Sequence, residues 1–237
     1  MIGTFINMTT VLLGGTLGVL LGARLPERLR QTVVAGLGLF TLAIGLMMFS
    51  KTENALVVLC SILIGALLGE WWRIEDGLQY FGQWLERRFT KGGEACQPRF
   101  VRGFLTASLL FCVGPMTILG SIQDGLTGNY QLLAIKSVLD GFASLAFASS
   151  MGIGVLFSVP VIFIYQGGLT LLAAQVQTVV TPAMMTEMSA AGGIILMAIA
   201  MSSLLELRAI RSANLLPALV LAPLFVAVLS TLGISLP

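Results

Sequence analysis

The sequence is dominated by long apolar stretches separated by short polar breaks. A helix that spans the hydrocarbon core of a bilayer needs about 20 mostly apolar residues, and eight stretches of this chain have that length or nearly so. Hydrophobic residues make up 57% of the chain and charged residues 10%, whereas soluble domains typically contain about 25% charged residues. We therefore predict an all-α, polytopic membrane helix bundle that forms a single transmembrane domain over residues 1–237. The predicted spans run from Ile2 to Ala23, Thr32 to Phe49, Ala55 to Trp72, Phe104 to Ile122, Gln131 to Ser149, Gly154 to Gln175, Met188 to Leu205 and Leu215 to Leu236.

The basic residues predict the orientation of these spans, because Lys and Arg favour cytoplasmic loops. Eleven of the 13 basic residues fall in loops separated by even numbers of crossings, and so on one side. They are Arg24, Arg28, Arg30, Arg73, Arg87, Arg88, Lys91, Arg99, Arg102, Arg208 and Arg211. Both termini are then outside. A seven-span alternative, with the fifth and sixth spans fused, moves Arg208 and Arg211 outside and is rejected.

Residues 73–99 form the one long polar stretch and are predicted to be a cytoplasmic loop. Its first half places Ile74, Leu78, Phe81 and Leu85 at helical spacing, with acidic and amide residues on the opposite face. This pattern indicates an amphipathic helix in the inner headgroup layer, with tryptophans as interfacial anchors. Packing against a second protomer is the alternative interpretation. The Gly and Pro content of TKGGEACQPR predicts a loop.

Glycines at four-residue spacing predict close helix contacts. Gly14, Gly18 and Gly22 line one face of the first span, and Gly65 and Gly69 one face of the third. Small residues let helix backbones approach in lipid, either within the chain or between chains of a homo-oligomer. The pattern gives no indication of a catalytic or binding site.

Two halves of the chain resemble each other weakly. Residues 38–47 are similar to residues 193–202, Asn54 opens the third span as Asn214 opens the eighth, and the first span can be set beside the sixth. Each element recurs five crossings later. Because five is an odd number, the second copy runs in the opposite direction across the membrane, and the interpretation is an inverted repeat of spans 1–3 and 6–8. Transporters often use this plan, with the site near the midplane between the repeats. The alternative is that any two apolar stretches look alike.

Polar residues gather between Phe111 and Gly141, in and beside the fourth and fifth spans. Pro115 cannot donate a hydrogen bond to the Phe111 carbonyl, so the helix is expected to break at Gly114-Pro115 and to form a hinge. A broken span persists only where its backbone lines protein or a cavity. The polar residues that follow the break are Thr117, Ser121, Gln123 and Asp124.

Lys136 and Asp140 lie inside the fifth span, one helical turn apart. Asp140 is nine residues past Gln131, about 14 Å into a core of about 30 Å, and therefore near the midplane. Intramembrane charges usually mark function, and the functional interpretation is a site in which Asp140 coordinates an ion or accepts a proton and Lys136 is its counter-ion. A structural ion pair that fixes this helix to a neighbour is the alternative. Gln166 and Asn7 are further candidates, each also interpretable as an interhelical hydrogen bond. Glu70, Glu187 and Glu206 lie at span ends and are interpreted as interfacial.

Several kinds of site find no support in the sequence. The chain has no histidine, and its cysteines, Cys60, Cys96 and Cys112, are scattered, so no metal site or cofactor is predicted. The net charge of +2 gives no reason to expect nucleic acid. There is no HExxH or GxSxG, and a valine follows Gly152-Ile153-Gly154 where an intramembrane aspartyl protease needs an aspartate. An enzyme is therefore not expected.

The segments GPMTILGSIQDGLTGN, KSVLDG, IGTFINMTTVLLGG and NLLPALVLA resemble the YqgA/YdfK-like family of uncharacterised bacterial integral-membrane proteins. The resemblance covers nearly the whole chain and is most specific from Phe111 to Gly141. It implies a multi-pass protein of the bacterial inner (plasma) membrane. The family has no established activity and supplies no catalytic residues.

The sequence thus favours a transporter or channel for a small ion or polar solute, with the lipid bilayer as its surroundings. The polar stretch holds two acidic residues, Asp124 and Asp140, and one lysine, Lys136, and this excess of negative charge favours a cation or proton as the transported species. Half-helix ends are also suited to an anion. The alternative is a non-transporting membrane scaffold or sensor, held together by its glycine faces and its amphipathic helix.

Overall fold

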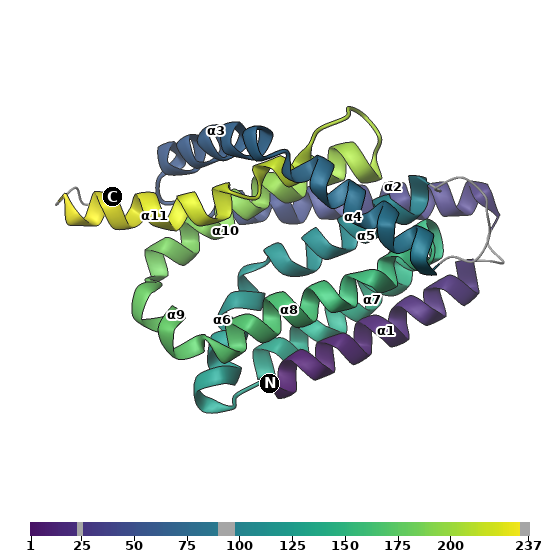
Figure 1. The fold of residues 1–237 in the computed structure, drawn as a ribbon, viewed down its shortest axis with the longest axis horizontal. Helices are drawn as coiled ribbons and strands as arrows, with labels where there is room; N and C mark the ends of the chain where they lie inside the picture. The colour runs from purple at the N-terminus through teal and green to yellow at the C-terminus, as the bar shows by residue number, and fades with distance from the viewer. Residues whose placement is uncertain (23–25, 90–97, 233–237) are drawn as a thin grey trace. The chain divides into compact units, whose positions relative to one another are not determined.

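A computed structural model describes residues 1–22, 26–89 and 98–232, and within these ranges the chain is helical with no β-strand (Figure 1). Seven helical segments are long and apolar enough to cross a membrane, and the bent pair α5–α6 makes an eighth if it is counted as one span. The prediction of an all-α, polytopic membrane bundle is therefore confirmed. The seven segments are α1 (Ile2–Gly22), α2 (Glu27–Phe49), α3 (Ala55–Trp72), α7 (Gln131–Met151), α8 (Ser158–Leu171) with the 3-10 turn η1 (Ile153–Phe157), α10 (Pro182–Ile199) with the π turn η2 (Ala200–Leu204), and α11 (Ala218–Thr231) preceded by η3 (Ser212–Leu215).

The helices follow the predicted spans, but most of their bounds differ, and the fourth span extends over Pro98–Thr127 as α5 and α6. α3 has the predicted bounds, but α2 begins five residues early and α10 six residues early. α10 begins at Pro182 because the Thr181 hydroxyl accepts a hydrogen bond from the Met184 N–H (3.3 Å) and proline suits the first helical position. The helix of the sixth predicted span, α8, ends at Leu171, before the predicted end at Gln175, and the short helix α9 (Ala173–Val179) follows it. Several predicted features lie outside the described residues. They are the span ends at Ala23 and Leu236, Arg24, and most of the segment TKGGEACQPR, which includes Lys91 and Cys96.

The described residues separate into two compact units, which are described one at a time. Unit 1 comprises Met1–Leu37 and Leu78–Thr178, and unit 2 comprises Gly38–Gly77 and Val179–Pro237. The expectation of a single transmembrane domain stays a prediction. α4 (Ile74–Phe89) forms the predicted amphipathic helix, with acids in its first turn and arginines in its last turn.

Unit 1 is built on the parallel pairing of α1 with α7, which lie side by side (Figure 1). A Cβ on Gly14 or Gly18 would overlap the carbonyl oxygen of Gly141 or Leu145. The predicted glycine face thus packs within the chain, directly against the α7 backbone. α8 runs antiparallel to α1, since Gly15 lies near Leu156 while Thr4 contacts Thr170.

The polar stretch from Phe111 to Gly141 forms a bent helix followed by a hairpin. α5 (Pro98–Val113) and α6 (Pro115–Thr127) meet at Gly114 with a bend of 60°. The Phe111 carbonyl, which Pro115 cannot satisfy, accepts a hydrogen bond from the Thr117 hydroxyl (3.2 Å). α6 ends at Gly128, whose φ of 69° is the left-handed conformation that glycine adopts readily, and α7 begins at Gln131.

Unit 2 pairs α3 with α11 and α2 with α10, both antiparallel. Gly65 and Gly69 of α3 lie against Ala218 and Asn214. α2 crosses α10 where Gly45 and Gly193 meet, because a Cβ on either would clash with the carbonyl oxygen of the other.

Two buried or partly buried carboxylates hold the loops of unit 2. Glu187 is 1% exposed and accepts hydrogen bonds from the Thr52 hydroxyl (2.6 Å) and from the N–H groups of Glu53 (2.8 Å) and Asn54 (3.1 Å). Glu187 thus holds the loop before α3, and its interfacial position stays a prediction. Glu75 accepts from the Ala213 N–H (2.9 Å), and its own N–H donates to the Asn214 side chain (2.7 Å).

Matched glycine substitutions test the α1–α7 contact. Gly14→Ala is expected to lower the unfolding temperature because its Cβ meets the Gly141 carbonyl, whereas Gly36 of α2 has open space around the added methyl group. Gly36→Ala is expected to be neutral or to stabilise by up to about 1 kcal/mol through helix propensity. Thermal unfolding of the purified protein in one detergent compares the two variants. Equal effects would contradict the close contact.

Candidate functional site

Four buried polar side chains from three helices of unit 1 form one hydrogen-bonded cluster. The Asn7 side-chain amide of α1 donates to Asp140 of α7 (3.0 Å) and to the Gln166 side-chain oxygen of α8 (2.9 Å). Lys136 donates to the same Asp140 oxygen. Asn7 and Gln166 are fully buried, and the side chains of Lys136 and Asp140 are 6% and 12% exposed. The structure thus brings together residues separated by up to 159 positions.

Two threonines extend the cluster toward one end of the helices. The Gln166 amide donates to the Thr4 hydroxyl (3.4 Å), and the hydroxyls of Thr4 and Thr170 are 3.5 Å apart. The sequence interpretation did not include either threonine. Spacing along the helices was the available signal, because Thr4 precedes Asn7 by one turn and Thr170 follows Gln166 by one turn.

The opposite face of α7 is apolar and exposed. Ile135, Val138, Leu139 and Phe142 are each more than half exposed in the isolated chain. In a membrane-spanning helix this face meets lipid, so the charged pair points into the helix bundle. A lysine four residues before an aspartate is one helical turn away, which is why the pair forms within α7.

The cluster lies between the middle of the helices and the end at which α1 and α7 begin. Asp140 is about 14 Å along α7, whereas Asn7 and Gln166 are only about 8 Å from the corresponding ends of α1 and α8. The midplane position of Asp140 stays a prediction. The amide partners extend the cluster outward from it.

Asp124 lies at the same end of the helices and holds the start of α1. One carboxylate oxygen accepts hydrogen bonds from the Gly3 N–H (3.1 Å) and pairs with the Met1 amino group (3.0 Å). The other oxygen is buried without a hydrogen-bond partner. Asp124 is only 4% exposed, so the structure shows a helix anchor here and not an open entrance.

The remaining predicted site residues have different surroundings. Thr117 caps the broken helix, as described above, and the Ser121 hydroxyl is fully buried with no hydrogen-bond partner. Gln123 is exposed and is not brought into the cluster. Gly114 and Pro115 mark the α5–α6 break; their role as a hinge stays a prediction. Cys112, two residues before the break, lies within electrostatic range of Lys136 and Asp140.

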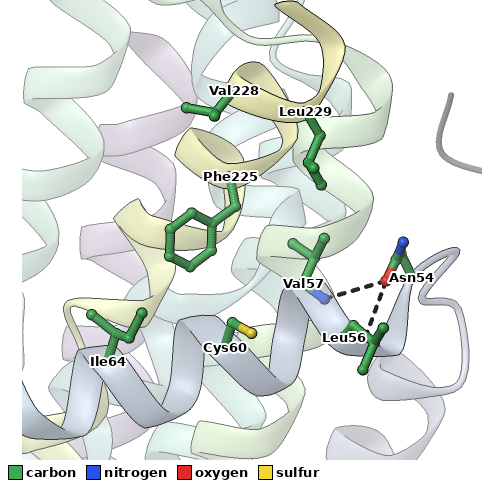
Figure 2. Close-up of a pocket in the computed structure, with 8 residues that line it drawn as sticks. All are labelled: Asn54, Leu56, Val57, Cys60, Ile64, Phe225, Val228 and Leu229. Atoms are coloured by element: carbon green, nitrogen blue, oxygen red, sulfur yellow. Dashed lines mark hydrogen bonds between the residues drawn. The ribbon is translucent and has the colours of Figure 1, made fainter. Parts of the chain in front are cut away.

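Unit 2 contains an apolar groove of about 460 Å³, separate from the polar cluster. Figure 2 shows Val57, Cys60 and Ile64 of α3 facing Phe225 of α11, with Asn54 at one end. The Asn54 side-chain oxygen already accepts hydrogen bonds from the N–H groups of Leu56 and Val57. The groove therefore offers little to a polar solute. Among the residues that the structure describes, no three His, Cys, Asp or Glu side chains are placed to hold a metal ion.

Comparisons with known proteins agree with a membrane protein. Over 223 residues the chain is 36% identical to "Uncharacterized protein YqgA" of Escherichia coli (strain K12), which covers 93% of this chain and 94% of that protein. It is 27% identical over 238 residues to "Uncharacterized membrane protein YdfK" of Bacillus subtilis (strain 168), with 99% of each chain covered. No solved structure matches the chain. The family model described as "Protein of unknown function (DUF554)" matches residues 2–227, and the chain belongs to this family.

Proposed function

We propose that this protein is a transporter or channel of the bacterial inner membrane that moves a small ion or polar solute past the cluster of Asn7, Lys136, Asp140 and Gln166. The observation that carries the proposal is the convergence of these four side chains from α1, α7 and α8. The proposal gives the protein no enzymatic activity.

The energetic cost of the cluster argues for a functional role. A lysine or aspartate at the centre of a membrane helix costs about 2.5–3.5 kcal/mol on insertion scales. Replacing a buried ion pair by apolar residues of similar size is often neutral or stabilising. Stability alone therefore gives little reason for Lys136 and Asp140 to lie inside α7.

The break between α5 and α6 supports the same proposal. Broken helices in transporter spans free backbone groups beside a substrate site. Here α5 and α6, on either side of the break, both pack against α7, which carries Lys136 and Asp140. A broken helix and a buried charged pair therefore occupy the same part of unit 1.

The predicted inverted repeat is consistent with the contacts inside each unit. Unit 1 pairs α1 with α8, and unit 2 holds α2 and α3 with α10 and α11. Each unit thus combines matched helices of both proposed copies. Intertwined copies of this kind are frequent in transporters.

A non-transporting membrane scaffold is the second candidate function. It is favoured by one face of α4, on which Tyr80 is 72% exposed and Trp84 51% exposed, next to exposed Arg87 and Arg88. Such a face suits an interfacial helix or a contact with another protomer. In this case the polar cluster would serve only to hold the helices together.

Flux into liposomes tests the transport proposal. Vesicles containing the protein are compared with empty vesicles for uptake of labelled Na⁺, Rb⁺, Cl⁻ and glycerol. At least one probe is expected to enter faster with the protein, and Asp140→Asn is expected to reduce that flux roughly tenfold or more because the intramembrane charge is lost. Asp76→Asn, the same change on exposed residue Asp76 of α4, should leave it unchanged. Unaltered flux in Asp140→Asn would contradict the proposed site.

A double substitution separates the two candidate functions. Lys136→Met alone is expected to destabilise the protein by about 3–5 kcal/mol because it leaves a buried carboxylate uncompensated. Lys136→Met combined with Asp140→Leu should recover most of that stability. Under the transport proposal, this well-folded double variant carries no flux in the liposome assay. A double variant that keeps full flux would favour the scaffold function for the pair.

A further inference from the structure

The hydrogen-bond pattern of Asn7 leaves one acceptor unused at the centre of the cluster. Both protons of its side-chain amide are engaged, one by Asp140 and one by Gln166. Both of these partners are acceptor oxygens, so the orientation of the amide is fixed. The Asn7 side-chain oxygen is then buried without a hydrogen-bond partner in a side chain that is 0% exposed. A buried acceptor of this kind calls for a donor or a cation.

We infer that the side-chain oxygens of Asn7 and Asp140 bind a monovalent cation, which displaces the Lys136 ammonium group from Asp140. This inference rests on the proposed function and names the class of ion that the site recognises. In the present structure the ammonium group of Lys136 occupies the carboxylate of Asp140. The Lys136 ammonium group thus competes with the transported cation for the Asp140 carboxylate, while the Asn7 oxygen is left for the cation.

Charge selects a monovalent ion. Asp140 supplies one negative charge, and the amides of Asn7 and Gln166 and the hydroxyls of Thr4 and Thr170 supply neutral oxygens. Buried ions must be matched by opposite charge, so one carboxylate suits a single positive charge. A divalent ion usually takes several carboxylates or waters, and the described residues hold no cluster of three such ligands.

Exchange with Lys136 keeps the buried charge balanced. Two cations beside one carboxylate would leave an uncompensated buried charge, so the arriving ion requires the ammonium group to leave Asp140. Lysine has a long, flexible stem, and a short rotation within one helical turn releases it. At Gly114, between α5 and α6, the backbone leaves helical geometry, and both of these helices pack against α7, which carries Lys136.

Thermal unfolding of the full chain in detergent tests the cation site without requiring transport. The protein is unfolded in NaCl, KCl, LiCl or choline chloride at equal ionic strength. At least one alkali chloride is expected to raise Tm by about 3 °C or more relative to choline chloride. Lys136→Met removes the competing ammonium group, so its Tm in choline chloride should fall and its gain from the alkali ion should exceed that of the wild type.

The variants give the experiment its controls. Lys136→Met combined with Asp140→Asn should show no alkali-specific gain, and Asn7→Leu should show a reduced one. Asp76→Asn should keep the wild-type gain. Equal Tm values in all four salts, for both the wild type and Lys136→Met, would overturn the inference. So would a gain that survives Asp140→Asn. Parallel runs in MgCl₂ and CaCl₂ at the same ionic strength complete the test, and a gain given only by these salts would also overturn the inference.

The flux assay separates this inference from the proposed function. If Cl⁻ or glycerol enters liposomes in a manner that depends on Asp140, while no alkali ion changes Tm, the cation site is wrong and the transport function stands. If an alkali ion stabilises the protein through Asp140 but no probe crosses the vesicle membrane, the cation site stands and transport is wrong.

Discussion

The ion pair between Lys136 and Asp140 is the constraint on which the arrangement of unit 1 depends. Two charges inside a membrane helix must be kept from lipid and given hydrogen-bond partners. α7 does this by placing both on one face, with apolar residues such as Phe142 on the other. A further donor comes from outside α7, since the Asn7 amide of α1 donates both to Asp140 and to the Gln166 side-chain oxygen of α8. The position of α1 against α7 therefore supplies a hydrogen bond to the carboxylate, and α8 holds the Asn7 amide that makes it.

Close helix packing makes these hydrogen bonds geometrically possible. The Asn7 side chain is short, and it reaches Asp140 at 3.0 Å only because the two helix backbones nearly touch. Gly14 and Gly18 provide that approach about two and three turns beyond Asn7, against the carbonyl groups of Gly141 and Leu145. In lipid, where apolar surface alone does not drive helices together, such packing and interhelical hydrogen bonds are the main forces available. The glycine face and the polar cluster thus act on the same helix pair, and loss of the first would separate the members of the second.

The sequence predicted the features that depend on neighbouring residues. It did not predict those that depend on contacts between residues far apart in the chain. The bounds of α3, the break at Gly114 and the Lys136–Asp140 pairing all follow from periodicity, proline chemistry and helical spacing. Asn7 and Gln166 were identified as polar residues in apolar spans, but their mutual hydrogen bond joins positions 159 residues apart and no local pattern contains it. Asp124 was identified only as a polar residue after the helix break, whereas its burial comes from contact with the start of α1. Glu187 was placed just before its span, whereas α10 begins at Pro182 and the loop before α3 folds over the Glu187 carboxylate.

The two units differ in how completely their buried polar groups are satisfied, and this difference bears on where chemistry takes place. In unit 2, Glu187 and Asn54 use their oxygens to hold backbone N–H groups, which is a structural use. In unit 1, by contrast, Asn7, Ser121 and Asp124 each keep a buried oxygen without a hydrogen-bond partner. Within the described ranges, no such atom belongs to unit 2. Because an unsatisfied buried oxygen is costly, each of these oxygens calls for a bound water or ion. The cation proposed above would supply that partner for Asn7, beside the charged pair of α7.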